Sequence, residues 1–122
     1  MVFMTDPTSP LAVARAYHEA WRRRDYVAAW QLLSDELTID VPINSYDAKA
    51  AFAEAAQRTR EMTSSVNDIA EFGDEGEAVL IYEMSLPIGD LRIAEYFVVE
   101  GGHITRIAHI HDTAALRAAG VG

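Results

Sequence analysis

The sequence has no cysteine among its 122 residues. Disulfide bonds, thiolate nucleophiles and cysteine-ligated metal sites are therefore excluded. Long apolar runs are also missing, and residues 1–7 lack the basic region and apolar stretch that mark a signal peptide. From these absences we expect a cytoplasmic protein that has no membrane partner.

Positive charge is scarce as well. Ten Lys and Arg stand against nineteen Asp and Glu, which gives a formal net charge of -9 at pH 7. A field of this sign repels phosphate groups, so we expect no nucleic-acid partner. The basic run from Arg22 to Arg24 falls late in a predicted helix, where cations interact favourably with the helix dipole. We interpret this run as a solvated helix face rather than a phosphate-binding site.

Apolar residues are plentiful. They make up 50% of the chain, and no low-complexity tract interrupts them. This composition is typical of a folded globular chain, and a chain of 122 residues is too short for two sound cores. We therefore predict a single domain over residues 1–122, with residues 1–8 as a loose N-terminal arm.

Apolar periodicity predicts helices first and strands after them. Ser9 and Pro10 form a strong helix start, because the hydroxyl can cap and proline fits the first turn. Alternation of apolar and polar residues predicts a strand that Pro42 stops. Later strands are joined by connections so short that neighbouring strands must be antiparallel. The predicted helices span residues 10–24, 26–33, 48–62 and 113–119, and the predicted strands span residues 37–41, 65–72, 78–86, 91–100 and 104–111.

This order of elements predicts an α+β fold in which helices cover one face of an antiparallel sheet. The sequence contains neither a nucleotide-binding motif nor the nucleophile motif of hydrolases. Gly101-Gly102 is a hairpin turn rather than a phosphate loop, and no serine lies in a nucleophile-elbow setting.

Four local strings carry a family resemblance. They are Ala-Tyr-His-Glu-Ala-Trp at 16–21, Leu-Thr-Ile-Asp-Val-Pro at 37–42, the segment from Glu95 to Ile107, and His111-Asp112. In their order and separations they resemble the nuclear transport factor 2-like superfamily, and within it the SnoaL-like and ketosteroid-isomerase-like proteins. The resemblance covers nearly the whole chain.

The resemblance implies a cone-shaped fold, in which a curved antiparallel sheet and N-terminal helices enclose a pocket for a small molecule, commonly in a homodimer. Members of the superfamily include isomerases, epoxide hydrolases, dehydratases, polyketide cyclases and binding modules without chemistry. The fold therefore leaves the function open, and the residues must decide it.

Two enzyme patterns of the superfamily fit only in part. The ketosteroid-isomerase pattern needs a tyrosine on the first helix and two acids on strands. Tyr17 resembles the tyrosine, but Val41 and Ala94 stand where the acids should be. In the limonene-epoxide hydrolase pattern, Asp40 falls on the first-strand polar position and His109 on the last-strand base, yet no arginine is present near residues 81–83.

One constellation remains after these comparisons. His109 and His111 have the same parity on the last strand, so their side chains point to one face. When the strand positions are aligned with the ketosteroid-isomerase pattern, this face is the concave one, and Arg92 and Tyr96 of the neighbouring strand share it. A carboxylate beside an imidazole makes a base near neutral pH. We therefore predict Asp40 and His109 as a catalytic pair. Further side chains are predicted to bind or polarise the substrate, namely Tyr17, Trp30, Arg92, Tyr96 and His111.

Each of these residues also has a plain structural interpretation. Asp40 would fit the solvent side of an edge strand, and strand histidines facing a core are often only hydrogen-bonded. Tyr17 would fit as packing on an aromatic helix stripe. Two same-face histidines near Asp112 would suit zinc or iron, but Asp112 is better explained as a helix cap. We predict no metal and no cofactor.

The sequence thus predicts a protein with a pocket for a small molecule, and it leaves two alternative functions. One is a cofactor-independent enzyme performing proton transfer, cyclisation, hydration or dehydration on a small apolar compound, such as a polyketide- or terpenoid-like molecule. The other is a non-catalytic ligand-binding or dimerisation module. An enzyme requires a carboxylate and an imidazole within about 3 Å of each other or of a common water.

Overall fold

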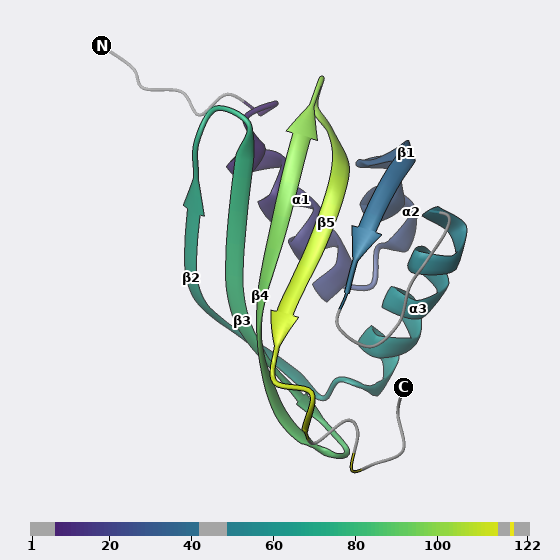
Figure 1. The fold of residues 1–122 in the computed structure, drawn as a ribbon. Coiled ribbons are helices and arrows are strands. Elements are labelled where there is room, and N and C mark those ends of the chain that lie inside the picture. The colour runs from purple at the N-terminus through teal and green to yellow at the C-terminus, as the bar shows by residue number, and fades with distance from the viewer. Residues whose placement is uncertain (1–6, 42–48, 115–117, 119–122) are drawn as a thin grey trace.

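The computed structural model describes residues 7–41, 49–114 and 118 (Figure 1). Two helices come first, then a strand, a third helix and four more strands. The bounds are α1 Pro10–Arg22, α2 Tyr26–Gln31, β1 Leu33–Asp40, α3 Lys49–Met62, β2 Ser65–Gly73, β3 Glu77–Leu86, β4 Gly89–Glu100 and β5 His103–His111. The helix predicted over 113–119 lies largely outside the described residues, as does most of the predicted arm over residues 1–8.

The sheet has five strands in the order β1-β5-β4-β3-β2, and it is open, with β1 and β2 at its edges. Strands β2 to β5 are antiparallel neighbours, as expected from their short connections. The predicted antiparallel sheet is mixed at one edge, because β1 pairs with β5 in parallel. Parallel strands need a long connection, and here α3 and three strands lie between β1 and β5 in the chain.

Strand β1 begins earlier than predicted. Apolar spacing placed Leu33 at the end of the second helix, but the structure pairs it with Ile104 and buries it in the core. The carbonyl of Leu32 accepts a hydrogen bond from the Ile104 amide at 2.8 Å. A cross-strand partner thus satisfies a backbone group that a longer helix would otherwise use.

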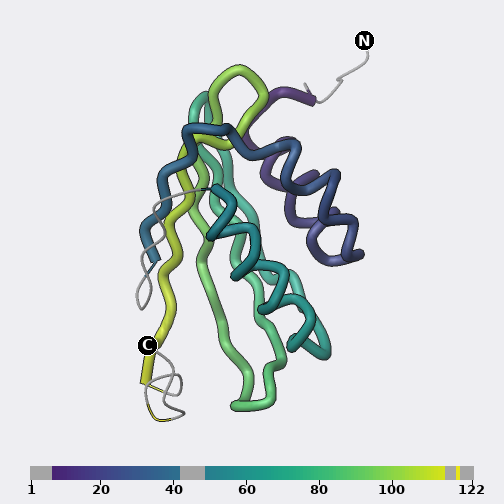
Figure 2. Tube along the Cα trace, turned by 90° about the vertical axis from the view of Figure 1, so that its right-hand side faces the viewer, coloured from purple at the N-terminus to yellow at the C-terminus, as the bar shows by residue number. Residues whose placement is uncertain are grey.

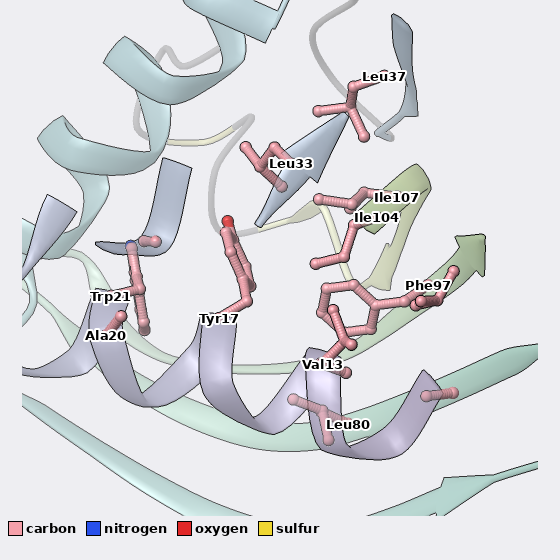
Figure 3. Packing of buried hydrophobic residues seen from close by; sticks show 14 of the residues in the cluster. Val13, Tyr17, Ala20, Trp21, Leu33, Leu37, Leu80, Phe97, Ile104 and Ile107 are labelled. Carbon is pink, nitrogen blue, oxygen red and sulfur yellow. The ribbon is translucent and has the colours of Figure 1, made fainter. Parts of the chain in front are cut away.

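Helix α1 provides most of the cover for the sheet. The Ser9 hydroxyl caps it by accepting from the Ala12 amide at 3.3 Å, as the sequence predicts. Val13 and Tyr17 point from the helix toward Phe97 in the middle of the sheet (Figure 3). The three helices lie on one side of the sheet (Figure 2), which we call its inner face, and no helix of the described residues covers the opposite, outer face.

The core is the layer between the helices and the inner face. Its fully buried members come from α1, β1, β4 and β5, and they include Val13, Leu33, Phe97, Ile104 and Ile107. Apolar burial of this kind is the main favourable term in folding. No helix of the described residues is long and apolar enough to cross a membrane.

Gly73 marks a close approach between the end of β2 and α1. A Cβ placed on it would lie 2.8 Å from the Leu11 Cβ, closer than real Cβ atoms come. Gly73→Ala is therefore expected to lower the free energy of unfolding by about 1–3 kcal/mol through overpacking. Urea unfolding measures this change, and Gly76→Ala is the matched control, because a Cβ there would meet nothing within 4 Å. Equal stability of the two variants would contradict the close approach.

Candidate active site around Glu95 and His109

An imidazole and a carboxylate meet on the inner face of the sheet. His109 and Glu95 are direct cross-strand partners in the β4–β5 ladder. The His109 Nε2 atom lies 2.7 Å from Oε2 of Glu95. This short, charge-assisted contact is the arrangement that the sequence analysis required for an acid–base pair.

Glu95 is the buried partner of the pair, with only 3% of its surface exposed. Its second oxygen, Oε1, accepts a hydrogen bond from the Tyr82 hydroxyl at 2.9 Å. Both carboxylate oxygens therefore have a partner, as a buried charge requires. Tyr82 comes from β3, so three neighbouring strands build this cluster.

The environment of Glu95 keeps it ionised. Burial would raise the pKa of its carboxyl, but the charge and the hydrogen bond of His109 oppose this effect. His18 and the Tyr82 hydroxyl also lower the pKa of Glu95, and the net result is a value below the ordinary 4.5. A negative charge is thus held against the imidazole at neutral pH.

Two tyrosines beside this charge stay protonated. Burial, and then the charge of Glu95, raises the pKa values of Tyr17 and Tyr82 well above the ordinary value of 10.0. The Tyr82 hydroxyl is engaged by Glu95, whereas the Tyr17 hydroxyl has no hydrogen-bond partner among the described residues. Tyr17 packs edge-on against Phe97 and near Trp30, at ring-centroid distances of 5.8 and 6.3 Å. Tyr17 itself is buried, with 3% of its surface exposed.

The second ring nitrogen of His109, Nδ1, is not bound by Glu95. In the neutral imidazole, the bond to the carboxylate assigns the proton to Nε2 and leaves the lone pair on Nδ1. No hydrogen bond to Nδ1 is present within the described part of the chain. The Phe52 ring of α3 lies 6.2 Å away, so a proton acceptor stands beside an apolar side chain. This is the setting in which a general base acts.

Asp40 does not join His109. It is exposed at the end of β1, and in the parallel ladder it pairs with Ala108. Ile39 pairs with Ile107, which is fully buried on the inner face, so Asp40 and Ala108 belong to the outer face. The expected pairing of Asp40 with His109 is therefore replaced by that of Glu95 with His109.

The five predicted binding residues divide between the two faces. Tyr17 and the half-buried Trp30 adjoin the core, and His111 shares the inner face with its partner Ile93. Arg92 and Tyr96 lie on the outer face instead, where Arg92 donates to Glu83 at 3.3 Å. The prediction that Arg92 and Tyr96 share a face with His109 is wrong, because the positions of β4 buried under the helices are the odd-numbered ones.

Glu95 and Tyr82 are the site residues that the sequence analysis missed. A signal for Glu95 was present, since it alternates with Ile93, Phe97 and Val99, all of which are buried. A charged residue at such a position needs a partner in the core. Within the described residues no group of three or more His, Asp or Glu side chains is arranged to hold a metal ion.

Solved structures similar to this one share its architecture. A protein from Kribbella flavida DSM 17836 has 27% identity and a TM-score of 0.85, over 93% of this chain and 94% of that chain. An NTF2-like protein of unknown function from Cytophaga hutchinsonii ATCC 33406 has 14% identity and a TM-score of 0.77, over 96% and 99%. A candidate ketosteroid isomerase from Kribbella flavida DSM 17836 has 17% identity and a TM-score of 0.75, over 86% and 78%. No family model and no curated protein matches the chain.

Proposed function

We propose that this chain, whose fold is that of the nuclear transport factor 2-like proteins, is an enzyme that moves a proton on a small, largely apolar organic molecule. His109 is the acid–base group. The observation that carries the proposal is the 2.7 Å contact between His109 and a carboxylate buried in the core. A structure of this fold that is a candidate ketosteroid isomerase supports proton transfer as the reaction class.

A contribution to stability alone does not explain why the core contains the Glu95–His109 pair. A buried ion pair is often no more stabilising than apolar side chains of the same size, because both charges lose their hydration. Paired titratable groups buried in a core are instead common at catalytic sites. Glu95 fixes the tautomer of His109 and stabilises the imidazolium that forms when the ring takes a proton.

The chemistry requires only groups that the chain supplies. Nδ1 of His109 takes a proton from the carbon next to a carbonyl group. The electron pair of that C–H bond forms a C=C bond to the carbonyl carbon, and the π pair of the C=O bond moves onto the oxygen, which gives an enolate. Tyr17 donates a hydrogen bond to this oxygen as its negative charge develops. The imidazolium then returns the proton to the same or another carbon, which gives exchange or isomerisation. The polyketide- and terpenoid-like compounds that carry a ketone group are substrates of this kind.

The test follows proton exchange directly. A panel of small apolar ketones is incubated with the protein in D2O, and ¹H NMR records the loss of α-protons. His109→Gln is expected to slow exchange about 100-fold, the usual size of a lost general base. His103→Gln is the matched control and is expected to leave the rate unchanged, because His103 is exposed at the start of β5. Equal rates in the two variants, or no exchange of any ketone, would count against the proposal.

The outer face supports a second proposal, a homodimer. Apolar side chains gather there on β2 to β5, and two of them, Phe72 and Ile110, are 62% and 69% exposed. Exposed apolar side chains that gather on one face are characteristic of association sites. A second copy of the chain is the occupant that the family resemblance implies. We define the outer-face patch as Phe72, Val79, Ile81, Ala94, Tyr96, Val98, Ala108 and Ile110.

A further inference from the structure

A second imidazole–carboxylate pair lies between α1 and β2. Nε2 of His18 is 2.7 Å from Oδ1 of Asp68, and the other carboxylate oxygen of Asp68 accepts from Arg22 at 2.8 Å. His18 is buried, with 4% of its surface exposed, whereas the Asp68 side chain is 48% exposed. The pair therefore links the protein surface to the core.

The backbone of β2 is adapted to this contact. The β2–β3 ladder is regular up to the pair Asp68–Tyr82 and resumes at Ala70–Ile81, so Ile69 is an extra residue in the strand. Such an irregularity changes which face the following side chains occupy. It allows Asp68 to share the inner face with Tyr82 while Ala70 lies on the outer face.

The imidazole of His18 is not needed for packing alone. Its Nδ1 atom is buried and has no hydrogen-bond partner in the described part of the chain. A buried polar atom without a partner is unfavourable, and an apolar ring at this position would avoid that cost. The polar feature that the imidazole adds here is its bond to Asp68.

The ring of His18 is in contact with the cluster that supports the candidate active site. It lies 4.5 Å from the Tyr82 ring and stacks with Trp21 at 5.7 Å, and Trp21 in turn lies 6.1 Å from Tyr82. Trp21 is itself held, because its Nε1 donates to the Ala56 carbonyl of α3 at 3.0 Å. Tyr82 in turn donates to Glu95, which binds His109.

We propose that His18 is a positioning residue for the Glu95–His109 pair. Asp68 fixes the ring of His18, the ring fixes Tyr82, and Tyr82 holds Glu95 in the orientation that binds His109. The catalytic meaning of this chain of contacts rests on the proposed function, but the contacts themselves are tested without a substrate. The influence of His18 on the pKa of Glu95 agrees with their proximity.

The experiment observes the proton that His109 shares with Glu95. ¹H and ¹⁵N NMR give the chemical shifts of the His109 ring and the exchange rate of its Nε2 proton with water. Asp68→Asn is close in shape to the native residue and lies at a half-exposed position, so the fold is expected to remain. We expect about tenfold faster exchange of the His109 Nε2 proton in this variant, because Glu95 becomes less restrained.

Glu71→Gln is the matched control. Glu71 is another carboxylate of β2, and it is bound by Arg15 of α1, but within the described residues no hydrogen bond joins Glu71 to His18 or Tyr82. This variant is expected to leave the signals of the His109 ring unchanged. Faster exchange of the His109 proton in Glu71→Gln, to the same degree as in Asp68→Asn, would show a general loosening and overturn the proposal.

The Tyr82→Phe variant tests whether the effect of Asp68→Asn reaches His109 through Tyr82. If the effect of Asp68 passes through Tyr82, the double variant Asp68→Asn/Tyr82→Phe exchanges no faster than Tyr82→Phe alone. Full additivity, or an unchanged His109 signal in Asp68→Asn, would refute the positioning role of His18. Failure of the ketone exchange assay would instead count against the proposed function and leave this result standing.

Discussion

Replacement of His109 by leucine is expected to lower the free energy of unfolding at pH 7 by about 3–5 kcal/mol. The reason is the position of Glu95, which is 3% exposed and ionised. Without the imidazole it becomes a buried charge whose only side-chain partner among the described residues is the Tyr82 hydroxyl. Urea unfolding followed by circular dichroism gives the free energy.

The double variant His109→Leu/Glu95→Gln separates the lost pair from the lost packing. Glutamine has no charge but still offers an oxygen to the Tyr82 hydroxyl. We expect the double variant to recover at least about 2 kcal/mol of the loss, because the cost lies in the unpaired charge. Arg58→Leu is the control, since its pair with Glu54 is exposed on both sides and contributes about 0.5 kcal/mol or less.

Acid supplies an independent check on the same pair. The pKa of Glu95 is lower in the folded protein than its ordinary value of 4.5. Its ionised form therefore stabilises the fold above about pH 4.5, and this contribution is lost as the pH falls through the folded-state pKa. The stability of the wild type should fall more steeply than that of Glu95→Gln below this pH. Two results together would contradict a buried ion pair between Glu95 and His109. One is that His109→Leu/Glu95→Gln is no more stable than His109→Leu, and the other is that the wild type and Glu95→Gln lose stability in parallel as the pH falls.

Two lysines on the outer-face patch are expected to raise the dissociation constant of the proposed homodimer at least about 1000-fold. In the double variant Phe72→Lys/Ile110→Lys, each subunit would bring two charges into an apolar contact, and the symmetry of a homodimer doubles the effect. The net charge of -9 per chain already opposes association, so apolar contact must supply the favourable energy. Sedimentation equilibrium over micromolar concentrations measures the constant.

The control carries the same added charge on another surface. Val27 of α2 and Met62 of α3 are 70% and 56% exposed, and they lie on the helices rather than on the outer face. Val27→Lys/Met62→Lys is expected to leave the dissociation constant within a few-fold of the wild type. A monomeric wild-type protein, or equal dissociation of both double variants, would rule out a homodimer through the outer-face patch.

The sequence by itself determined the type and order of the elements, because the period of apolar residues differs between helices and strands. The cap at Ser9 and the short hairpins after Gly73 and Leu86 are local features, and they fixed helix α1 and the antiparallel strands. The inward orientation of His109 was also predicted, from its parity and the family resemblance. The elements, the cap and the hairpins depend on residues close together in the chain, whereas the face that His109 occupies was taken from the family resemblance.

Only the tertiary structure decided which carboxylate meets His109. Strand β4 carries apolar residues on both faces, with Phe97 and Val99 on one and Tyr96 and Val98 on the other, so alternation alone could not identify the covered face. The packing of the helices selected the odd-numbered positions and placed Glu95 beside His109. The parallel register of β1 turned Asp40 to the opposite face. Both outcomes depend on contacts between distant segments, which a one-residue change of register would reverse.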